Sequence, residues 1–257
     1  MSRVRLDSLL AERGLFESRS RAAAAILAGS VRIADRRATK AGQLVDQDVE
    51  LTVDASPAYV SRGGVKLSNA LDALGVPVAD RDALDVGAST GGFTDCVLQR
   101  GAARVIALDV AYGELDYRLR SDARVTVVER TNARALTSLP YPPSLIVVDV
   151  SFISLTKLLP AVVALAAPEF DCLAMVKPQF EVGRDRVGKG GVVRDPELRR
   201  SAVASVAGCG VALGCSVMGF APSGLPGPAG NLETFVWLAE GSRPAPDWQA
   251  RLAEVDV

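Results

Sequence analysis

The spacing of apolar residues changes near residue 60, which divides the chain into two patterns. Within residues 3–53, apolar positions first follow a helical spacing and then alternate in short strand-like segments. The helical positions are Leu6, Leu9 and Leu10, and Gly14 is expected to end that helix. Ser18 is placed to cap a second helix, which Gly29 ends. This pattern predicts a small α+β module with short strands at 30–36, 42–48 and 49–53.

After residue 64, apolar segments of strand length alternate with helical segments. The predicted strands cover 83–88, 104–110, 124–130, 145–150, 172–177, 214–220 and 233–240, and helices are expected after Lys66, Gly92, Ser154 and Pro196. Nearly continuous apolar strands separated by helices indicate a parallel sheet covered on both faces. Because only a Gly/Pro-rich loop at 221–230 joins the last two strands, they are expected to form an antiparallel hairpin at one edge. The fold class is therefore α/β, a Rossmann-like and mostly parallel seven-stranded sheet with a small N-terminal α+β domain.

The N-terminal module is expected to be a separate and basic domain. The stretch "DASPAYVSRGG", residues 54–64, contains Pro57 and two glycines and is the best linker candidate. We predict an N-terminal domain over 1–55, a linker over 56–63 and a second domain over 64–257. Residues 1–40 carry nine Arg or Lys and four Asp or Glu, a surplus of five positive charges, whereas the net charge of the whole chain is −1.

Composition excludes several classes of protein. The chain has no histidine, which removes Ser–His triads and most zinc enzymes, so acid–base chemistry must use Lys, Asp, Glu, Tyr or Cys. The four cysteines form no C-x-x-C pair, which favours the reduced cytoplasm and no metal site. The longest apolar run, 158–167, is about half the ~18–20 residues of a spanning helix and contains Pro160, so no membrane segment is expected.

The segment "LDVGASTGGF", residues 84–93, reads as a strand, a glycine-rich turn and a helix that together could hold a nucleotide-like cofactor. Its spacing differs from the dinucleotide G-x-G-x-x-G motif, because Ala88 and Ser89 follow Gly87. Asp109 ends the next strand, where an acid accepts hydrogen bonds from ribose hydroxyls, and this combination fits S-adenosylmethionine as well as NAD. The predicted cofactor-binding residues are Asp85, Gly87, Ala88, Ser89, Thr90, Gly91, Gly92, Phe93, Asp109, Asn132 and Asp149.

Four charged residues are expected to meet in one crevice. Lysine is scarce, with five lysines against 24 arginines, so Lys177 at the end of an apolar strand is informative. Asp149 also follows a strand, Glu233 begins the antiparallel final strand, and Lys66 begins the helix that leads into the domain. Because carboxyl ends of parallel strands surround the ligand crevice, this topology brings the four together. Taken singly, each has a structural interpretation. Lys66 could be a solvated helix residue and Asp149 a helix cap. Glu233 could be a hairpin charge and Lys177 a snorkelling strand end.

Five stretches follow the arginine-rich N-terminal segment in the order "YVSRGGVKL", "LDVGASTGGFTD", "VVDVSFISL", "MVKPQFE" and "GNLETFVWL". Together they resemble the TlyA family of ribosomal-RNA 2′-O-methyltransferases, which is related to the FtsJ/RrmJ ribose methyltransferases and whose members have also been named haemolysins. The resemblance covers essentially the whole chain. It implies an N-terminal RNA-binding domain of the αL type, S-adenosylmethionine as cofactor, and cytidines of 16S and 23S rRNA as substrates. It also implies a Lys-Asp-Lys-Glu catalytic tetrad at Lys66, Asp149, Lys177 and Glu233. The chain departs from some relatives in the linker, where Ser56, Pro57 and Tyr59 replace Arg and Trp.

The chemistry of ribose methylation suggests a role for each of these four residues. A 2′-hydroxyl is a weak acid, and a lysine can accept its proton if desolvation or a second cation lowers the lysine pKa. We hypothesise that Lys177 orients and deprotonates the hydroxyl, with Lys66 as the second cation and as an RNA phosphate contact. Asp149 and Glu233 would orient the two amines and offset their charge.

RNA is expected to contact basic residues in both domains. The predicted phosphate contacts of the N-terminal domain are Arg3, Arg5, Arg19, Arg21, Arg32, Arg36 and Arg37. The glycine-rich and basic segment 181–195 is interpreted either as a mobile loop that closes over RNA or as a solvated surface loop. Arg62, Arg184 and Lys189 complete the predicted RNA-binding set.

Two other functions stay open from the sequence. One is a pore-forming haemolysin, which the lack of an apolar span disfavours. The other is an NAD-binding oxidoreductase, which leaves the two lysines and the N-terminal domain unexplained. The sequence does not identify the target nucleotide or the oligomeric state, although a monomer is favoured.

Overall fold

A computed structural model describes residues 3–27, 30–34, 36–53 and 58–257 in two compact units, Met1–Ala58 and Tyr59–Val257. The predicted domain boundaries stay predictions. Of the residues used in the sequence analysis, Gly29, Ser56 and Pro57 lie outside the described part. Tyr59 and the residues up to Gly63, which were assigned to the linker, are described with the second unit.

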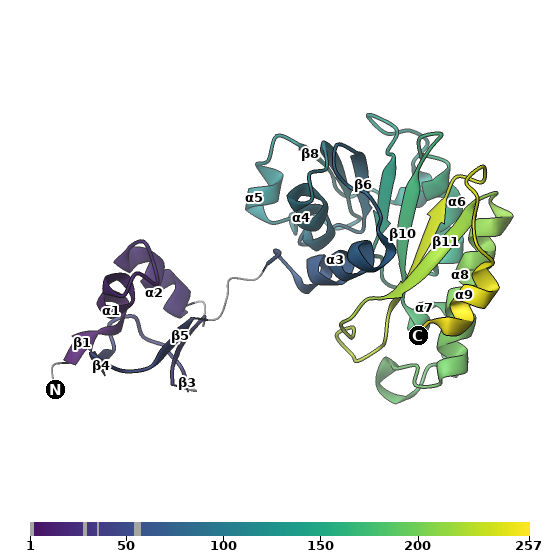
Figure 1. Ribbon diagram of the computed structural model, residues 1–257. Coiled ribbons are helices and arrows are strands. Elements are labelled where there is room, and N and C mark those ends of the chain that lie inside the picture. The colour runs from purple at the N-terminus through teal and green to yellow at the C-terminus, as the bar shows by residue number, and fades with distance from the viewer. Residues whose placement is uncertain (1–2, 28–29, 35, 54–57) are drawn as a thin grey trace. The chain divides into compact units, whose positions relative to one another are not determined.

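The first unit packs two helices against short strands around an apolar core. Its elements are β1 (Arg3–Arg5), α1 (Leu6–Glu12), α2 (Arg19–Leu27), β2 (Val31–Ile33), β3 (Arg36–Arg37), β4 (Leu44–Asp46) and β5 (Leu51–Val53) (Figure 1). Strand β1 pairs with β4, and β2 lies between β3 and β5, all antiparallel. The three predicted leucines of α1 are 0–2% exposed. The Ser18 hydroxyl accepts a hydrogen bond from the Arg21 amide at 3.3 Å, so the predicted cap of α2 is confirmed.

The second unit is built on a seven-stranded sheet with the order β11-β12-β10-β9-β6-β7-β8. Its strands are β6 (Asp82–Val86), β7 (Arg104–Leu108), β8 (Val125–Val128), β9 (Leu145–Val148), β10 (Asp171–Val176), β11 (Ser216–Pro222) and β12 (Thr234–Ala239). Strands β6 to β10 are parallel, whereas β12 runs antiparallel to both β10 and β11. The predicted α/β fold class and edge hairpin are therefore confirmed, with β12 inserted between β10 and β11.

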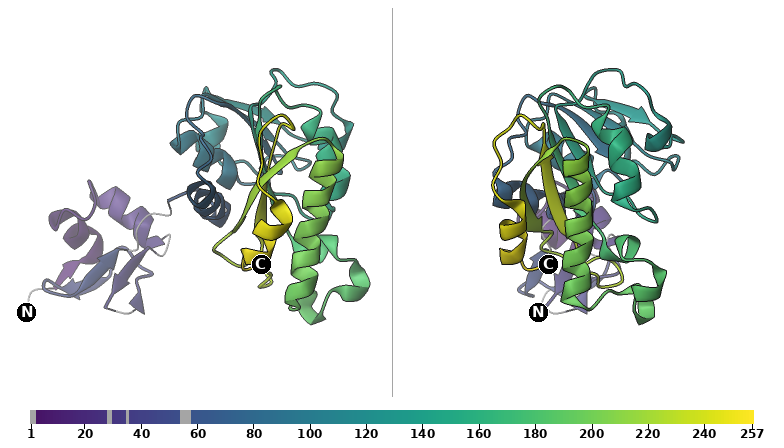
Figure 2. Two further views of the ribbon diagram at one scale, coloured as in Figure 1. Left: turned by 45° about the vertical axis from the view of Figure 1, so that its right-hand side comes forward. Right: turned by 90° about the vertical axis from the view of Figure 1, so that its right-hand side faces the viewer.

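Helices cover both faces of this sheet (Figures 1 and 2). Helices α3 (Arg62–Leu74), α4 (Gly92–Gln99) and the short α5 (Tyr117–Arg120) pack on one face. Helices α6 (Leu155–Val163), α8 (Pro196–Ala212) and α9 (Trp248–Glu254) pack on the other, and α7 (Pro178–Glu181) follows β10. On β9, Leu145 and Val147 enter one core while Ile146 and Val148 enter the other, all 0% exposed. Burial on both faces explains why the strands read as continuous apolar runs.

Two sequence expectations about helices need correction. Helix α3 begins at Arg62, so Lys66 lies in its second turn and does not begin it. The first turn of α3 packs closely on α4, since a Cβ atom at Gly64 would lie 2.8 Å from the Gly92 carbonyl oxygen. The short helices α5, α7 and α9 were not predicted, because each has at most seven residues and shows little periodicity.

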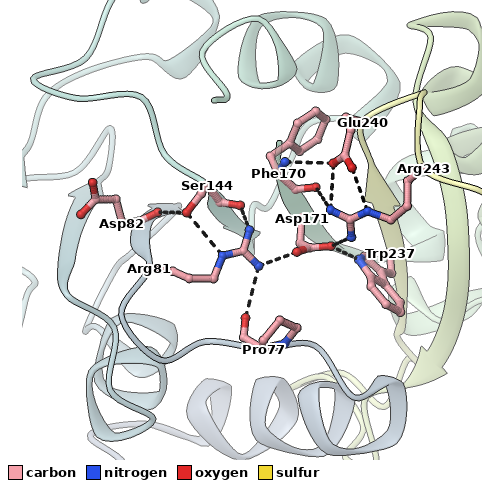
Figure 3. Close-up of polar contacts among 9 residues, drawn as sticks. All are labelled: Pro77, Arg81, Asp82, Ser144, Phe170, Asp171, Trp237, Glu240 and Arg243. Carbon is pink, nitrogen blue, oxygen red and sulfur yellow. Dashed lines mark hydrogen bonds and ion pairs between the residues drawn. The ribbon is translucent and has the colours of Figure 1, made fainter. Parts of the chain in front are cut away.

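A buried carboxylate ties the amino end of β10 to its neighbours (Figure 3). Asp171 is 2% exposed and forms ion pairs with Arg81 and Arg243. It also accepts a hydrogen bond from the Trp237 indole at 2.8 Å. Arg243 in turn pairs with Glu240 at 2.8 Å, so this Asp171 cluster joins the loop before β6 to β10 and to the end of β12. Its polar groups are matched inside the protein.

Candidate active site

Charged residues gather at the edge of the sheet where the parallel strands end. Asp109 follows β7, Asp149 follows β9 and Lys177 follows β10. Val176 pairs with Thr234 across the antiparallel β10–β12 ladder, which places Glu233 at the same edge. The strand order alone therefore brings together side chains that lie far apart along the chain.

These residues line a cavity of about 400 Å³, which we call the tetrad cavity. Lys66, Asp149, Lys177 and Glu233 all line it, as the sequence predicted for one crevice. The other lining residues are Ser61, Arg62, Gly63, Gly87, Ala88, Ser89, Thr90, Gly92, Phe93, Pro226 and Pro228. The cavity thus combines the glycine-rich turn, the start of α3 and the loop between β11 and β12.

The four charged residues form two ion pairs in this cavity. Lys66 is paired with Glu233, and their side chains are 9% and 1% exposed. The Lys177 Nζ atom lies 2.6 Å from Asp149 Oδ1 and donates a hydrogen bond to the Ser151 hydroxyl at 3.0 Å. Each lysine is therefore matched by one carboxylate, and the more accessible pair is Lys177 with Asp149, at 12% and 26% exposure. Ser151 was not predicted, although it lies two residues after Asp149.

A second cavity of about 460 Å³ adjoins the first, and we call it the Asp109 cavity. Gly87, Ser89 and Asp149 line both cavities. The remaining lining includes the predicted Asp109 and Asn132, together with apolar residues such as Val86, Leu108, Val110, Ile153 and Leu158. An apolar pocket with a few polar groups at its edge suits a planar, partly polar ligand. Asp149 lines both cavities and therefore lies between such a ligand and the tetrad cavity.

The glycine-rich turn has a backbone that only glycine accommodates at one position. Gly87 has φ +87°, and a Cβ atom there would lie 2.3 Å from the Asp149 carbonyl oxygen. The turn is anchored to the next strand, because the Gly87 and Ala88 amides donate to the Leu108 carbonyl. The Ser89 amide donates to Asp109 Oδ2 at 2.7 Å, and the Ala111 amide donates to Asp109 Oδ1 at 2.7 Å. Asp109 is thus fixed in orientation at the rim of its cavity.

Asp85 and Gly91 line neither cavity, which differs from the predicted set of cofactor contacts. Asp85 is 0% exposed, and its Oδ2 atom accepts hydrogen bonds from the Thr94 amide and hydroxyl at 2.9 and 2.7 Å. It therefore caps α4 from inside the protein. Its Oδ1 atom is buried without a hydrogen-bond partner among the described residues. Burial, followed by repulsion from Asp149 and Asp109, raises the pKa of Asp85 to about 7.

The acidic residues that line the Asp109 cavity give it a negative wall, which a cationic ligand would offset. Asp149 and Asp109 both disfavour the charged form of Asp85. Two ion-paired lysines lie in the tetrad cavity, whereas the Asp109 cavity has two acidic residues besides Asp149, with Glu114 accepting a hydrogen bond from Ser89 at 3.0 Å. The donor set of the Asp109 cavity therefore fits a ligand that carries positive charge and hydroxyl groups.

Sequence reasoning missed an exposed aromatic residue beside this site. Phe152 is 91% exposed, has φ +67° and lines the Asp109 cavity. A bulky residue in the left-handed region is uncommon and is concentrated at functional sites. Its position three residues after Asp149, directly beyond a strand end, was the available signal.

The predicted RNA-binding residues lie on the surface of both units. In the first unit, Arg3, Arg5, Arg19, Arg21, Arg36 and Arg37 are exposed and Arg32 is half-buried. Asp7 pairs with Arg5 at 2.7 Å and with Arg19 at 3.5 Å, and the Arg5 guanidinium lowers the pKa of Asp7 to about 2. In the second unit, Arg62, Arg184 and Lys189 are exposed, and only Arg62 lines the tetrad cavity. The predicted loop 181–195 contains two 3₁₀ turns, η2 (Arg184–Arg186) and η3 (Lys189–Gly191).

Comparison with known proteins agrees with this arrangement. Residues 59–240 match the FtsJ-like methyltransferase family and residues 4–51 match the S4 domain. The chain is 51% identical over 240 residues to the Mycobacterium tuberculosis 16S/23S rRNA (cytidine-2′-O)-methyltransferase TlyA, covering 92% of this chain and 90% of that protein. It is 43% identical to Hemolysin A of Brachyspira hyodysenteriae, covering 80% and 89% of the two chains. A solved structure named as a hemolysin from Streptococcus thermophilus matches with a TM-score of 0.75 and 38% identity over 99% of this chain and 94% of that one.

These relatives bear on the alternatives left by the sequence. The methyltransferase match contradicts the NAD-oxidoreductase alternative, since it covers the whole seven-stranded unit up to Glu240. Within the described residues, no helix is both long and apolar enough to cross a membrane. With a glycine-rich turn, a carboxyl-edge crevice and an N-terminal S4 domain, the chain belongs to the FtsJ-like methyltransferase family.

Proposed function

We propose that this protein transfers a methyl group from S-adenosylmethionine to ribose 2′-hydroxyls of ribosomal RNA, at cytidines of 16S and 23S rRNA. The observation that carries the proposal is the convergence of Lys66, Asp149, Lys177 and Glu233 on one cavity that adjoins the Asp109 cavity. The name of the Mycobacterium tuberculosis relative supports the substrate. A ribosomal substrate would place the protein in the cytoplasm. A monomer would suffice for the reaction, because one chain contributes all four residues.

The Asp109 cavity would hold the cofactor. Asp109 would accept hydrogen bonds from ribose hydroxyls, and Asn132 lies on the same wall. The apolar lining would contact the adenine ring, and Asp149 with Glu114 would offset the positive charge of the ligand. When bound, S-adenosylmethionine supplies an electrophilic methyl group on a sulfonium. The residues of this cavity would therefore hold the methyl donor close to Asp149, which lines both this cavity and the tetrad cavity.

The Lys177–Asp149 pair would handle the hydroxyl proton. Lys177 is held by Asp149 Oδ1 at 2.6 Å and by the Ser151 hydroxyl at 3.0 Å, so its amine has a defined direction at the junction of the two cavities. We propose that this pair would orient the 2′-hydroxyl and that the Lys177 amine, in its deprotonated form, would accept the hydroxyl proton. Holding both reactants in line supplies much of the rate, because orientation removes a large entropic cost.

The Lys66–Glu233 pair would position the ribose rather than act as a free cation. Glu233 is 1% exposed and is matched by Lys66, so little net charge faces the cavity from this side. The exposed Arg62 donates a hydrogen bond to the Pro226 carbonyl at 2.9 Å and lines the same cavity. Arg62 is therefore the better candidate for a phosphate contact than Lys66, which the sequence alone had suggested.

The S4 domain would add affinity for ribosomal RNA. Its surplus of arginines suits contact with phosphates, which fix the register of a protein on RNA without reading bases. Arg5 and Arg19 share Asp7, so part of their charge is offset inside the domain. We therefore assign the larger phosphate contribution to Arg3, Arg21, Arg36 and Arg37.

Methyl transfer to ribosomal subunits tests the proposal. Purified 30S and 50S subunits from cells without this protein are incubated with tritiated S-adenosylmethionine and the full chain. We expect tritium in rRNA, recovered as alkali-resistant dinucleotides, because a 2′-O-methyl group blocks hydrolysis of the following phosphodiester. Tritium only on bases, or none in either subunit, would contradict the proposal. A parallel leakage assay with dye-filled liposomes tests the hemolysin name, and we expect no release of dye.

A further inference from the structure

A third cavity of about 690 Å³ lies outside the proposed catalytic machinery, and we call it the Phe180 cavity. Its lining comes from the loop after β9, the start of α6, the helix α7 and the turns that follow. Its lining residues include Arg134, Phe152, Lys157, Gln179, Phe180 and Arg184. Phe152 and Ile153 also line the Asp109 cavity, so the Phe180 cavity adjoins the proposed site of methyl transfer.

One wall of the Phe180 cavity is aromatic. The rings of Phe152 and Phe180 have centroids 5.3 Å apart and an interplanar angle of 51°. Phe152 is 91% exposed on a left-handed backbone, so its ring contributes little to the core. An exposed ring beside a half-buried one forms a face on which a planar group can stack.

The rim of the Phe180 cavity is positively charged. Arg134, Lys157 and Arg184 all line it and all are exposed. In the described part of the chain, none of the three has a carboxylate within ion-pair distance, whereas seven other arginines of this unit are paired with one. Three unmatched cations around an aromatic face suit a planar base joined to phosphates.

The wall of the cavity includes a residue with an unsatisfied buried acceptor, and it has a rigid frame. The Gln179 Oε1 atom is buried without a partner among the described residues, and Gln179 lines the cavity. Glu181 accepts hydrogen bonds from the Ser154 hydroxyl at 2.6 Å and from the Leu155 amide at 2.8 Å. These bonds join α7 to the start of α6, so the two halves of the cavity are held together without a ligand. Buried polar atoms usually have partners, which makes Gln179 an indicator of a missing ligand.

We propose that the Phe180 cavity binds a nucleotide of the RNA strand next to the methylated residue. Its base stacks on Phe180, with Phe152 at the edge, and lies beside Gln179. Its phosphates lie against Lys157, Arg184 and Arg134. Proteins recognise bases of single-stranded RNA loops in an unstacked state. Holding one neighbouring nucleotide out of the stack therefore exposes the ribose of the target. This inference rests on the proposed function, because it specifies the RNA segment which that function requires.

Two substitutions with matched controls test the cavity in the full-length protein. Phe180→Ala removes the stacking face, and Tyr117→Ala removes an aromatic ring that is 79% exposed on α5. Lys157→Gln removes a rim charge, and Arg251→Gln removes an exposed charge on α9. The measurements are the dissociation constant for 30S and 50S subunits by filter binding, its salt dependence, and the affinity for S-adenosylmethionine by calorimetry.

We expect Phe180→Ala to weaken subunit binding about five-fold or more, as loss of one base-stacking contact does. Lys157→Gln should weaken binding and reduce the slope of log K against log salt by about one. Cofactor affinity should stay within two-fold for both variants and both controls should bind as the unchanged protein. Because Lys157 is exposed, its variant tests the cavity even if Phe180→Ala misfolds.

The possible failures are distinguishable. One outcome would overturn the cavity assignment and leave the proposed function standing. In that outcome, Phe180→Ala and Lys157→Gln both bind subunits within two-fold of the unchanged protein, and methyl transfer is intact. Equal losses in the Tyr117→Ala and Arg251→Gln controls would also overturn it. An unchanged protein that methylates neither subunit would overturn the proposed function and this inference with it.

Discussion

Strand β10 carries an ionic cluster at each end, and the two clusters differ in burial and in how their charges are matched. At its start, Asp171 pairs with Arg81 and Arg243 and accepts a hydrogen bond from the Trp237 indole (Figure 3). At its end, Lys177 meets Asp149 and Ser151 at the border of two cavities. Strand β12 spans the same two clusters, since Glu233 precedes it and Glu240 follows it.

This difference separates a stabilising role from a chemical one. A buried carboxylate that arginines surround on all sides holds elements together, and removing it leaves uncompensated charge. A lysine–carboxylate pair that borders a cavity can still interact with a ligand through the side that faces the cavity. Substitutions at the two ends of β10 should therefore change different properties of the protein.

The largest expected effect is loss of methyl transfer at the Lys177 end. Lys177→Ala should lower kcat by about 10²–10⁴-fold, the usual contribution of a positioned acid–base group. Tritium incorporation into ribosomal subunits measures this, and cofactor affinity by calorimetry shows whether the fold is intact. Lys177→Arg sharpens the result, because a guanidinium keeps its protons: full activity with arginine would rule out proton transfer to this residue.

At the other end of β10, substitution should cost stability rather than chemistry. Asp171→Ala leaves Arg81 without a carboxylate partner and Arg243 with Glu240 alone, so the free energy of unfolding should fall by about 3–5 kcal/mol. Asp82→Ala is the matched control, since it breaks a more exposed pair with Arg104 and should cost at most about 1 kcal/mol. Denaturant unfolding gives both values. If folded Asp171→Ala lost methyl transfer at low temperature, the contrast between the clusters would be wrong.

Asp85 is intermediate between the two clusters, because one of its oxygens is satisfied and the other is not. Its pKa is raised from 3.8 to about 7 by burial, so between those pH values the folded state holds a proton that the unfolded chain has lost. Stability should therefore fall as pH rises from about 4 to 7, by up to about 4 kcal/mol. Asp85→Asn should flatten this dependence. Thermal melts of both proteins between pH 5 and 8 measure it, and parallel curves would contradict the assignment.

The smallest effect is expected from exposed charges in the S4 domain. The double variant Arg36→Gln, Arg37→Gln removes two exposed cations of β3 and should reduce the salt slope of subunit binding by up to about two. Each lost phosphate contact should cost about 1 kcal/mol or less. Arg13→Gln serves as a comparison, since Arg13 donates to the Val49 and Gln47 carbonyls and should affect stability instead. An unchanged slope for the double variant would remove these arginines from the interface.

Much of the fold could be predicted because its rules are local or topological. The apolar runs of the strands, the Gly87 turn and the Ser18 cap are each readable from a few neighbouring residues. The rule that ligands bind at the carboxyl edge of a parallel sheet then placed Asp149 and Lys177 in one crevice. The roles of these residues stay predictions until the variants are measured.

Other features required the three-dimensional structure because they depend on contacts between distant segments. The sequence suggested Asp85 as a cofactor contact, but packing buries it under α4. Lys66 was expected as a second cation whose charge a carboxylate offsets, but only the antiparallel β12 shows that Glu233, and not Asp149, is its partner. The Phe180 cavity combines segments around residues 134, 152–157 and 179–191, and no local pattern marks such a combination.

The sequence by itself determined the order of strands and helices, the separate basic N-terminal module and the identity of the charged residues at strand ends. Those properties follow from residue periodicity, turn residues and composition, which act over a few neighbouring positions. Only the tertiary structure decided which charge meets which and where space is left beside them. Pairing and cavity shape depend on how side chains from remote segments pack, and sequence distance does not encode that packing.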